Sequence, residues 1–205
     1  HLKNQTPPHA GFDYFKHWLY GDNHWKTKVR DIPSGEEFKE VEGYNAIGMT
    51  DQAIDFIDDH AEDDKPFLLM LSINPPHYRW DDAPEEFVKL YPDDVLGMRR
   101  NVTDPRYKDL DGPMRRNYRH YHAHITAVDR ELGRLMDHLA KLGVEQNTVL
   151  VYTSDHGSSF GSNGVSNKAN PFDEAVRVPF IIRWPGRIAA DRAADHNLGT
   201  IDLYP

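Results

Sequence analysis

The sequence predicts an α/β fold in which a mixed, mostly parallel sheet is flanked by helices on both faces. Three apolar runs of strand length occur at 67–73, 148–154 and 178–184, and polar or turn-forming residues follow each run. Apolar residues at helical spacing occupy 44–60 and 115–142. Buried strands that alternate with amphipathic helices are typical of this class.

The N-terminal half is less regular. Residues 1–43 are polar, rich in aromatic residues, Gly and His, and only weakly periodic, so we expect ordered loop with short elements. The spacing at 44–60 predicts a helix with an apolar stripe of Ala46, Ile47, Ala53, Ile54, Phe56 and Ile57. The strand at 67–73 is an unbroken apolar run, which suits a strand covered on both faces.

The rigid turn Asn74-Pro75-Pro76-His77 ends that strand. Residues 78–113 then predict a surface excursion with one short helix near 84–90. A long helix at 115–142 carries Tyr118, Tyr121, Ile125, Val128, Leu132, Leu135, Met136, Leu139 and Leu142 at intervals of three and four. Gly143 suits the end of this helix.

Composition limits the possible functions. The 205 residues have a formal net charge of −9 and contain no cysteine. There is no basic excess to bind nucleic acid, no thiol chemistry, and neither a membrane-spanning run nor a signal peptide. We expect one domain over 1–205 with no internal boundary.

The strongest chemical signal is Ser154-Asp155-His156-Gly157, where the second apolar run ends. A carboxylate and an imidazole at a strand end are good metal ligands, and loops at such ends often carry the chemistry of α/β enzymes. The alternative is that Asp155 caps a turn and His156 only packs beside it.

Two more residues could act on an anionic substrate. His77 is held behind two prolines and could donate a proton to a leaving group, or it could be a surface histidine in a turn. Lys168, in a polar loop, could hold a tetrahedral anion, or it could be a solvated loop lysine. Asp173, Glu174 and Arg177 are interpreted as a local ion pair or a set that braces the loop, and not as catalytic residues.

Six segments in order resemble the sulfatase family of the alkaline-phosphatase superfamily. His1-Leu2 with 11–15 is similar to the end of the family's Gly-Lys-Trp-His-Leu-Gly signature, with Lys3 in place of the usual Gly. The others are the strand to Pro-His at 67–77, the helix at 121–135, the Thr-Ser-Asp-(Asn/His)-Gly strand at 148–157, the segment 168–186, and Asp202-Leu203-Tyr204-Pro205.

This resemblance implies an alkaline-phosphatase-like sheet, of which the chain is a central to C-terminal part, and a hydrolase of sulfate esters. Asp155 and His156 would bind a divalent metal, usually Ca²⁺. His77 and Lys168 would contact the sulfate ester and its bridging oxygen, and His1 would lie beside the nucleophile. The substrate would be a sulfated carbohydrate or an aryl sulfate.

The family's nucleophile is a formylglycine, made by a maturation enzyme from Cys or Ser in a Cys/Ser-x-Pro-x-Arg motif. That motif is not in these residues, so the resemblance places it upstream of residue 1. Family members are commonly exported, and we expect the same here.

Two alternatives remain open. Ca²⁺ prefers oxygen ligands, and His156 also suits Mn²⁺ or Zn²⁺ in relatives that cleave phosphonate monoesters or phosphodiesters. Lys168 and the Pro-Pro-His turn favour sulfate. The chain could also be a non-catalytic module that binds a sulfated glycan. Tyr78, Arg79 and Trp80 could stack on a sugar or aryl ring, or could only pack.

Overall fold

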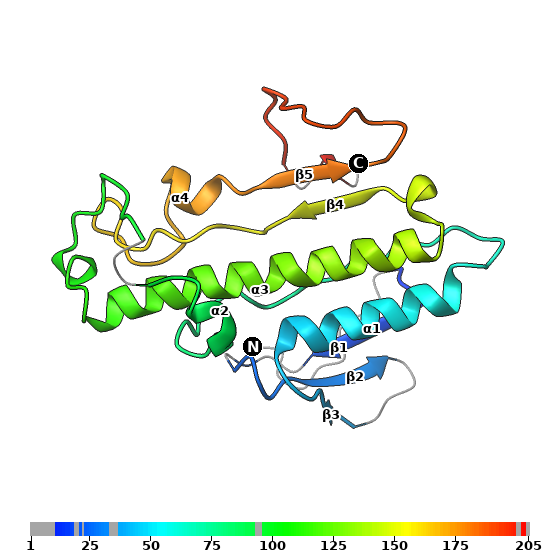
Figure 1. Ribbon diagram of the computed structural model, residues 1–205, viewed down its shortest axis with the longest axis horizontal. Helices are drawn as coiled ribbons and strands as arrows, with labels where there is room; N and C mark the ends of the chain where they lie inside the picture. Colours follow the sequence, from blue (N-terminus) through cyan, green and yellow to red (C-terminus); the bar gives the residue numbers. More distant parts are fainter. Residues whose placement is uncertain are drawn as a thin grey trace. The chain divides into compact units, whose positions relative to one another are not determined.

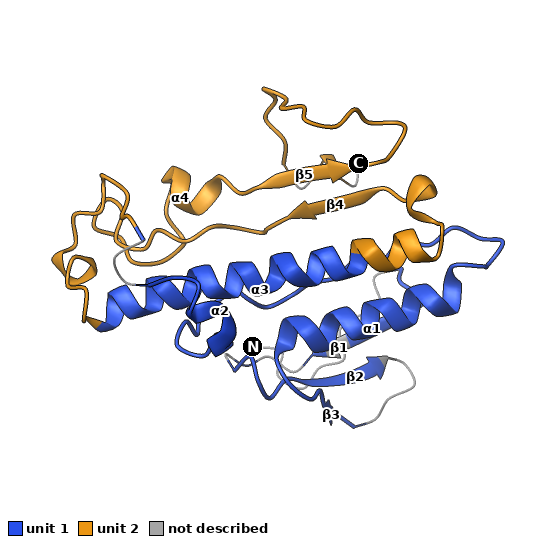
Figure 2. Cartoon of the chain, in the orientation of Figure 1, with its two compact units in different colours: residues 1–96, 113–135 blue, residues 97–112, 136–205 orange. Residues whose placement is uncertain are grey.

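The computed structural model describes residues 11–18, 21, 23–32, 37–92, 96–199 and 202–203. The chain divides into two compact units, coloured separately in Figure 2. Unit 1 comprises residues 1–96 and 113–135, and unit 2 comprises residues 97–112 and 136–205.

A small antiparallel sheet opens unit 1. Its strands are β1 (Phe15–Trp18), β2 (Lys28–Ile32) and β3 (Lys39–Glu40), in that order (Figure 1). Phe15 lies opposite Ile32, and Lys28 lies opposite Glu40. These short strands confirm the prediction of short elements before residue 44.

Two helices contribute buried apolar side chains to the core of unit 1. Helix α1 (Asn45–His60) confirms the predicted helix and buries Ala46, Ala53 and Ile57. The buried Thr50 also has a hydrogen-bond partner, because its hydroxyl donates to the Ala46 carbonyl at 2.8 Å. The short helix α2 (Glu85–Val88) buries both Phe87 and Val88.

Helix α3 (Pro113–Lys141) starts with a proline in its first turn and is followed by Gly143 at φ +74°. Both are favoured positions for these residues, and the predicted helix is confirmed. Its most buried face differs from the predicted stripe. Val128 and Leu139 are buried as expected, but the other buried members include Ala123, His124, Ala127 and Glu131.

Unit 2 contains a two-stranded antiparallel sheet of β4 (Leu150–Thr153) and β5 (Phe180–Arg183), with Leu150 opposite Arg183. The 3₁₀ helix η2 (Glu145–Asn147) precedes β4, helix α4 (Asp173–Val176) precedes β5, and a second 3₁₀ helix, η1 (Pro105–Tyr107), lies in 97–112. The predicted strands at 148–154 and 178–184 are therefore present in shorter form.

The remaining predicted strand, at 67–73, has no regular secondary structure and joins neither of the sheets among the described residues. Leu68 is 70% exposed and Met70 is 74% exposed. The prediction that this run is covered on both faces is wrong for the described residues. A strand of this kind needs a partner on its edge and packing on both faces, and the described residues provide neither for this run. The described ladders are all antiparallel.

Among the described helices, none combines the length and apolar character that a bilayer crossing requires.

Candidate active site

The loop after β4 brings the carboxylate of Asp155 and the imidazole of His156 together. Asp155 Oδ1 accepts a hydrogen bond from the His156 backbone N–H at 2.9 Å, and Oδ2 lies 3.2 Å from His156 Nε2. The Asp155 side chain is 81% exposed, so its carboxylate remains open to a ligand.

The tautomer of His156 follows from its neighbours. Its Nδ1 lies 3.0 Å from the Gly157 carbonyl, which can only accept, so Nδ1 carries a proton. In the neutral ring, Nε2 then offers its lone pair. Lys168 Nζ lies 3.0 Å from this atom and can donate to it in that protonation state. The structure therefore joins Asp155, His156 and Lys168, the three sequence-predicted site residues of unit 2.

This donor set fits a divalent cation. A carboxylate oxygen and an imidazole nitrogen 3.2 Å apart can both contact one ion. His156 Nε2 has only one lone pair, however, so it cannot accept from Lys168 and bind a metal at once. Metal binding at this atom requires the Lys168 ammonium to move to another acceptor, such as an anionic substrate.

The Gly157 backbone fixes this loop against α4. Gly157 N–H donates to the Ala175 carbonyl at 2.8 Å. A Cβ atom on Gly157 would lie only 2.1 Å from the backbone oxygen of Glu174, so a side chain does not fit here. The glycine of the Asp-His-Gly segment is thus explained by close backbone approach.

A second contact braces α4 from the segment 97–112. Glu174 Oε1 accepts from Asn101 Nδ2 at 2.6 Å, and Arg99 Nη1 lies 3.8 Å away. The hydrogen bond from Asn101 holds the pKa of Glu174 below its usual value. The predicted bracing role of Glu174 thus has a partner, Asn101, that the sequence pattern did not identify.

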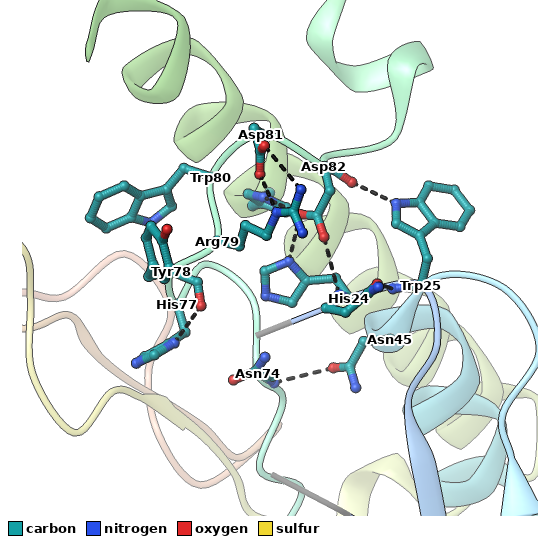
Figure 3. Close-up of polar contacts among 12 residues, drawn as sticks. His24, Trp25, Asn45, Asn74, His77, Tyr78, Arg79, Trp80, Asp81 and Asp82 are labelled. Atoms are coloured by element: carbon teal, nitrogen blue, oxygen red, sulfur yellow. Dashed lines mark hydrogen bonds and ion pairs between the residues drawn. The ribbon is translucent and has the colours of Figure 1, made fainter. Parts of the chain in front are cut away.

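His77 belongs to unit 1, in the turn that follows residues 67–73 (Figure 3). Its backbone N–H donates to the Asn74 carbonyl at 2.9 Å, and Nδ1 donates to the Tyr78 carbonyl at 2.6 Å. Asn74 is itself tied to α1, because its N–H donates to Asn45 Oδ1 at 3.2 Å. The imidazole is therefore held by a turn that is anchored to a helix.

The aromatic residues after His77 have different environments. Trp80 is 9% exposed and donates from Nε1 to the Pro76 carbonyl at 2.9 Å, so it packs beneath the turn. Tyr78 is 50% exposed. Arg79 is also exposed and pairs with Asp81 at 2.7 Å (Figure 3). Of the three residues considered for stacking, Trp80 is thus a packing residue. His1, also predicted at the site, lies outside the described residues.

The structure also contains a polar cluster that the sequence did not predict. His24 and His124 are fully buried, and Asp82 lies between them. Burial, with His24 nearby, lowers the pKa of His124 to about 3. Burial alone would raise the pKa of Asp82, but hydrogen bonds from His24 hold it below its usual value. Burial raises the pKa of Tyr44, which contacts His124.

The family model and the curated relatives agree on one family. The family model described as Sulfatase matches residues 1–205. The ulvan-active sulfatase of Formosa agariphila is 33% identical over 199 residues, covering 95% of this chain and 38% of the relative. The endo-4-O-sulfatase of Bacteroides thetaiotaomicron is 37% identical over 148 residues, covering 69% of this chain and 28% of the relative.

A solved structure supports the same fold. A Bacteroides thetaiotaomicron protein, from work on the metabolism of multiple glycosaminoglycans, matches with a TM-score of 0.76 at 28% identity. The match covers 87% of this chain and 37% of that one. The expected α/β class is therefore confirmed. The chain spans well under half the length of the two curated relatives named above.

Proposed function

The chain belongs to the sulfatase family, and from this premise we propose that the full-length protein hydrolyses sulfate esters on a polysaccharide. The observation that carries the proposal is the convergence of Asp155 and Lys168 on His156. Oδ2 of Asp155 and Nζ of Lys168 lie 3.2 Å and 3.0 Å from the same ring nitrogen. One locus thus offers both metal ligands and a cation for an anionic group.

Asp155 and His156 are the proposed metal ligands. A divalent ion bound there would neutralise charge on the non-bridging oxygens of the sulfate group. Ca²⁺ is the ion that the family resemblance favours, whereas the imidazole ligand also suits Mn²⁺ or Zn²⁺. The exposure of the Asp155 carboxylate supports binding of an ion at this position.

Lys168 and His77 are the proposed substrate-contacting groups. The Lys168 ammonium would pair with non-bridging sulfate oxygens once it leaves His156. His77 would protonate the bridging oxygen as the S–O bond breaks. Because Nδ1 of His77 is bonded to the Tyr78 carbonyl, the transferred proton would come from Nε2.

The proposed nucleophile and the proposed base both lie outside the described residues. The 205 residues contain no Cys/Ser-x-Pro-x-Arg motif, so we assign a formylglycine to a part of the full-length protein that precedes them. That group would supply the hydroxyl that attacks sulfur. His1 is the proposed base for sulfate release.

The proposed substrate class is a sulfated polysaccharide. The two relatives described above are named as ulvan-active and as an endo-4-O-sulfatase. In this chain, the exposed phenol ring of Tyr78 follows His77 directly and can pack on a sugar ring. Export, as is common in the family, fits such a substrate.

The test is a paired assay of the full-length protein. We expect metal-dependent release of sulfate from sulfated oligosaccharides and from an aryl sulfate, and a formylglycine detected by mass spectrometry. Phosphonate-ester turnover far above sulfate-ester turnover would replace the proposal with a phosphonate or phosphodiester hydrolase. If protein that carries the formylglycine binds the glycan but does not hydrolyse it, the chain is part of a binding module instead.

A further inference from the structure

Three segments of unit 1 meet at a buried group of metal-ligand side chains. His24 lies before β2, Asp82 lies after the His77 turn, and His124 lies on α3. Each residue offers one ligand atom, and these atoms all lie within 4.8 Å of one another. Both histidine side chains are 0% exposed, and the Asp82 side chain is 15% exposed.

The separations are close to those of ligands around one ion. Asp82 Oδ1 lies 2.7 Å from His24 Nδ1 and 3.5 Å from His124 Nε2. Ligand atoms about 2.0–2.1 Å from a tetrahedral zinc ion are about 3.3 Å apart. All three ligand atoms lie within 4.8 Å of one another, so movement of the side chains toward a common point would bring them into coordination.

The protein groups around the cluster leave two ring nitrogens unsatisfied. Nε2 of His24 and Nε2 of His124 are both buried without a hydrogen-bond partner. Buried polar atoms are normally paired, because an unpaired one has lost its hydration without compensation. A metal bound at Nε2 of both rings would give these two nitrogens a partner.

Outer contacts orient the rings as in known metal sites. Tyr44 Oη lies 2.5 Å from Nδ1 of His124, and the two rings are stacked at 13°. The His24 backbone N–H also donates to Asp82 Oδ2 at 3.1 Å, which holds the carboxylate in place. Metal-bound histidines usually have their second nitrogen fixed in this way.

We propose that His24, Asp82 and His124 bind a divalent transition metal ion of the zinc class within unit 1. Two imidazoles and one carboxylate favour such an ion over Ca²⁺, which prefers a shell of oxygen ligands. The burial of the side chains favours a structural role, and three protein ligands leave one position of a tetrahedral ion for water. The ion would fasten the segment that follows His77 to α3 and to the segment that precedes β2.

The experiment measures metal content in the full-length protein. After incubation with Zn²⁺ and removal of excess metal, elemental analysis should show one bound zinc ion per protein molecule that remains in an Asp155→Ala/His156→Ala variant. His24→Gln and His124→Gln should each lose that zinc ion. His60→Gln is the matched control, because His60 Nδ1 also lies 2.7 Å from a carboxylate, that of Asp63, but on the surface. This variant should keep the zinc.

A second measurement leaves the three cluster residues unchanged. X-ray absorption at the zinc edge of the Asp155→Ala/His156→Ala protein should show nitrogen and oxygen ligands with two imidazoles. Absence of a bound zinc ion in that protein would overturn the proposal. So would equal zinc retention by His24→Gln and His60→Gln. Failure of sulfate-ester hydrolysis alone would leave this site intact, because the readout here is bound metal.

Discussion

Nζ of Lys168 lies 3.0 Å from Nε2 of His156, the same atom that is proposed to bind the metal. A single lone pair cannot serve both partners, so the ammonium and the metal compete for His156 in the absence of substrate. An anionic ester would remove the conflict, because it gives Lys168 a new acceptor. The contact links metal binding to substrate binding.

Replacing Lys168 by Ala should therefore have two opposite effects in the full-length protein. The value of kcat/KM for a sulfate ester should fall about 10²–10³-fold, as when one charge-stabilising donor is removed. Metal affinity without substrate should rise, because His156 loses its competitor. Steady-state kinetics and metal titration measure the two effects. Lys108→Ala, an exposed lysine of unit 2, is the control and should change neither.

Gly157→Ala tests the close approach of the site loop to α4. The added Cβ would lie 2.1 Å from the Glu174 backbone oxygen, and backbone atoms cannot yield as a flexible side chain can. We expect a loss of about 1–3 kcal/mol in unfolding free energy, as for other overpacked positions. Denaturant unfolding measures it.

The matched control for that substitution is Gly133→Ala. A Cβ on Gly133 meets nothing within 4 Å, and the residue lies inside α3. This variant should be more stable than the wild type by about 0.5–1 kcal/mol, because alanine is the better helix former. Equal effects at the two glycines would contradict the packing explanation.

Glu131 should make stability depend on pH. Its side chain is 2% exposed on α3, and burial raises its pKa despite Arg134 and Arg130 nearby. The folded protein therefore binds the Glu131 proton more tightly than the unfolded chain does. The protonated carboxyl stabilises the fold, and this contribution is lost as pH rises through the raised pKa. Glu131→Gln should have the higher melting temperature near pH 7. The difference should close below about pH 4.3, the ordinary pKa of Glu.

Glu86→Gln is the control for Glu131, because Glu86 also pairs with Arg130 but its side chain is 61% exposed. Its melting temperature should follow that of the wild type throughout the pH range. A Glu131→Gln variant that is less stable than the wild type at pH 7 would mean that the contacts with Arg130 and Arg134 outweigh the cost of burial.

Local patterns were enough to predict some features and not others. Helices α1 and α3 follow from their periodicity, and Asp155-His156 was identified because a polar pair ends an apolar run. The segment 67–73 was predicted as a covered strand, but the structure assigns no strand there, because pairing and burial depend on neighbours that a pattern in one segment cannot specify. Leu68 and Met70 are exposed, although the apolar run predicted that their side chains would be buried.

The buried cluster shows a different limit. His24 and Asp82 are 58 positions apart, and only the fold brings them together. His124 lies on the buried face of α3, where an imidazole interrupts the apolar spacing. Such a residue indicates a buried polar contact without naming its partner. In the same way, the contact between His156 and Lys168 depends on the path of the loop at 157–170.

His77 and Lys168 can be separated by the leaving group of the substrate. A general acid matters most when the departing oxygen is a strong base, so His77→Ala should slow alkyl and sugar sulfates more than nitrophenyl sulfate. We expect a loss of about 10²–10⁴-fold for the poor leaving groups and a much smaller loss for the good one. Lys168 acts on the non-bridging oxygens, so Lys168→Ala should slow all of these esters by a similar factor. A plot of log kcat/KM against leaving-group pKa should therefore steepen for His77→Ala and keep its slope for Lys168→Ala. Parallel lines for both variants would show that His77 positions the substrate and does not donate the proton.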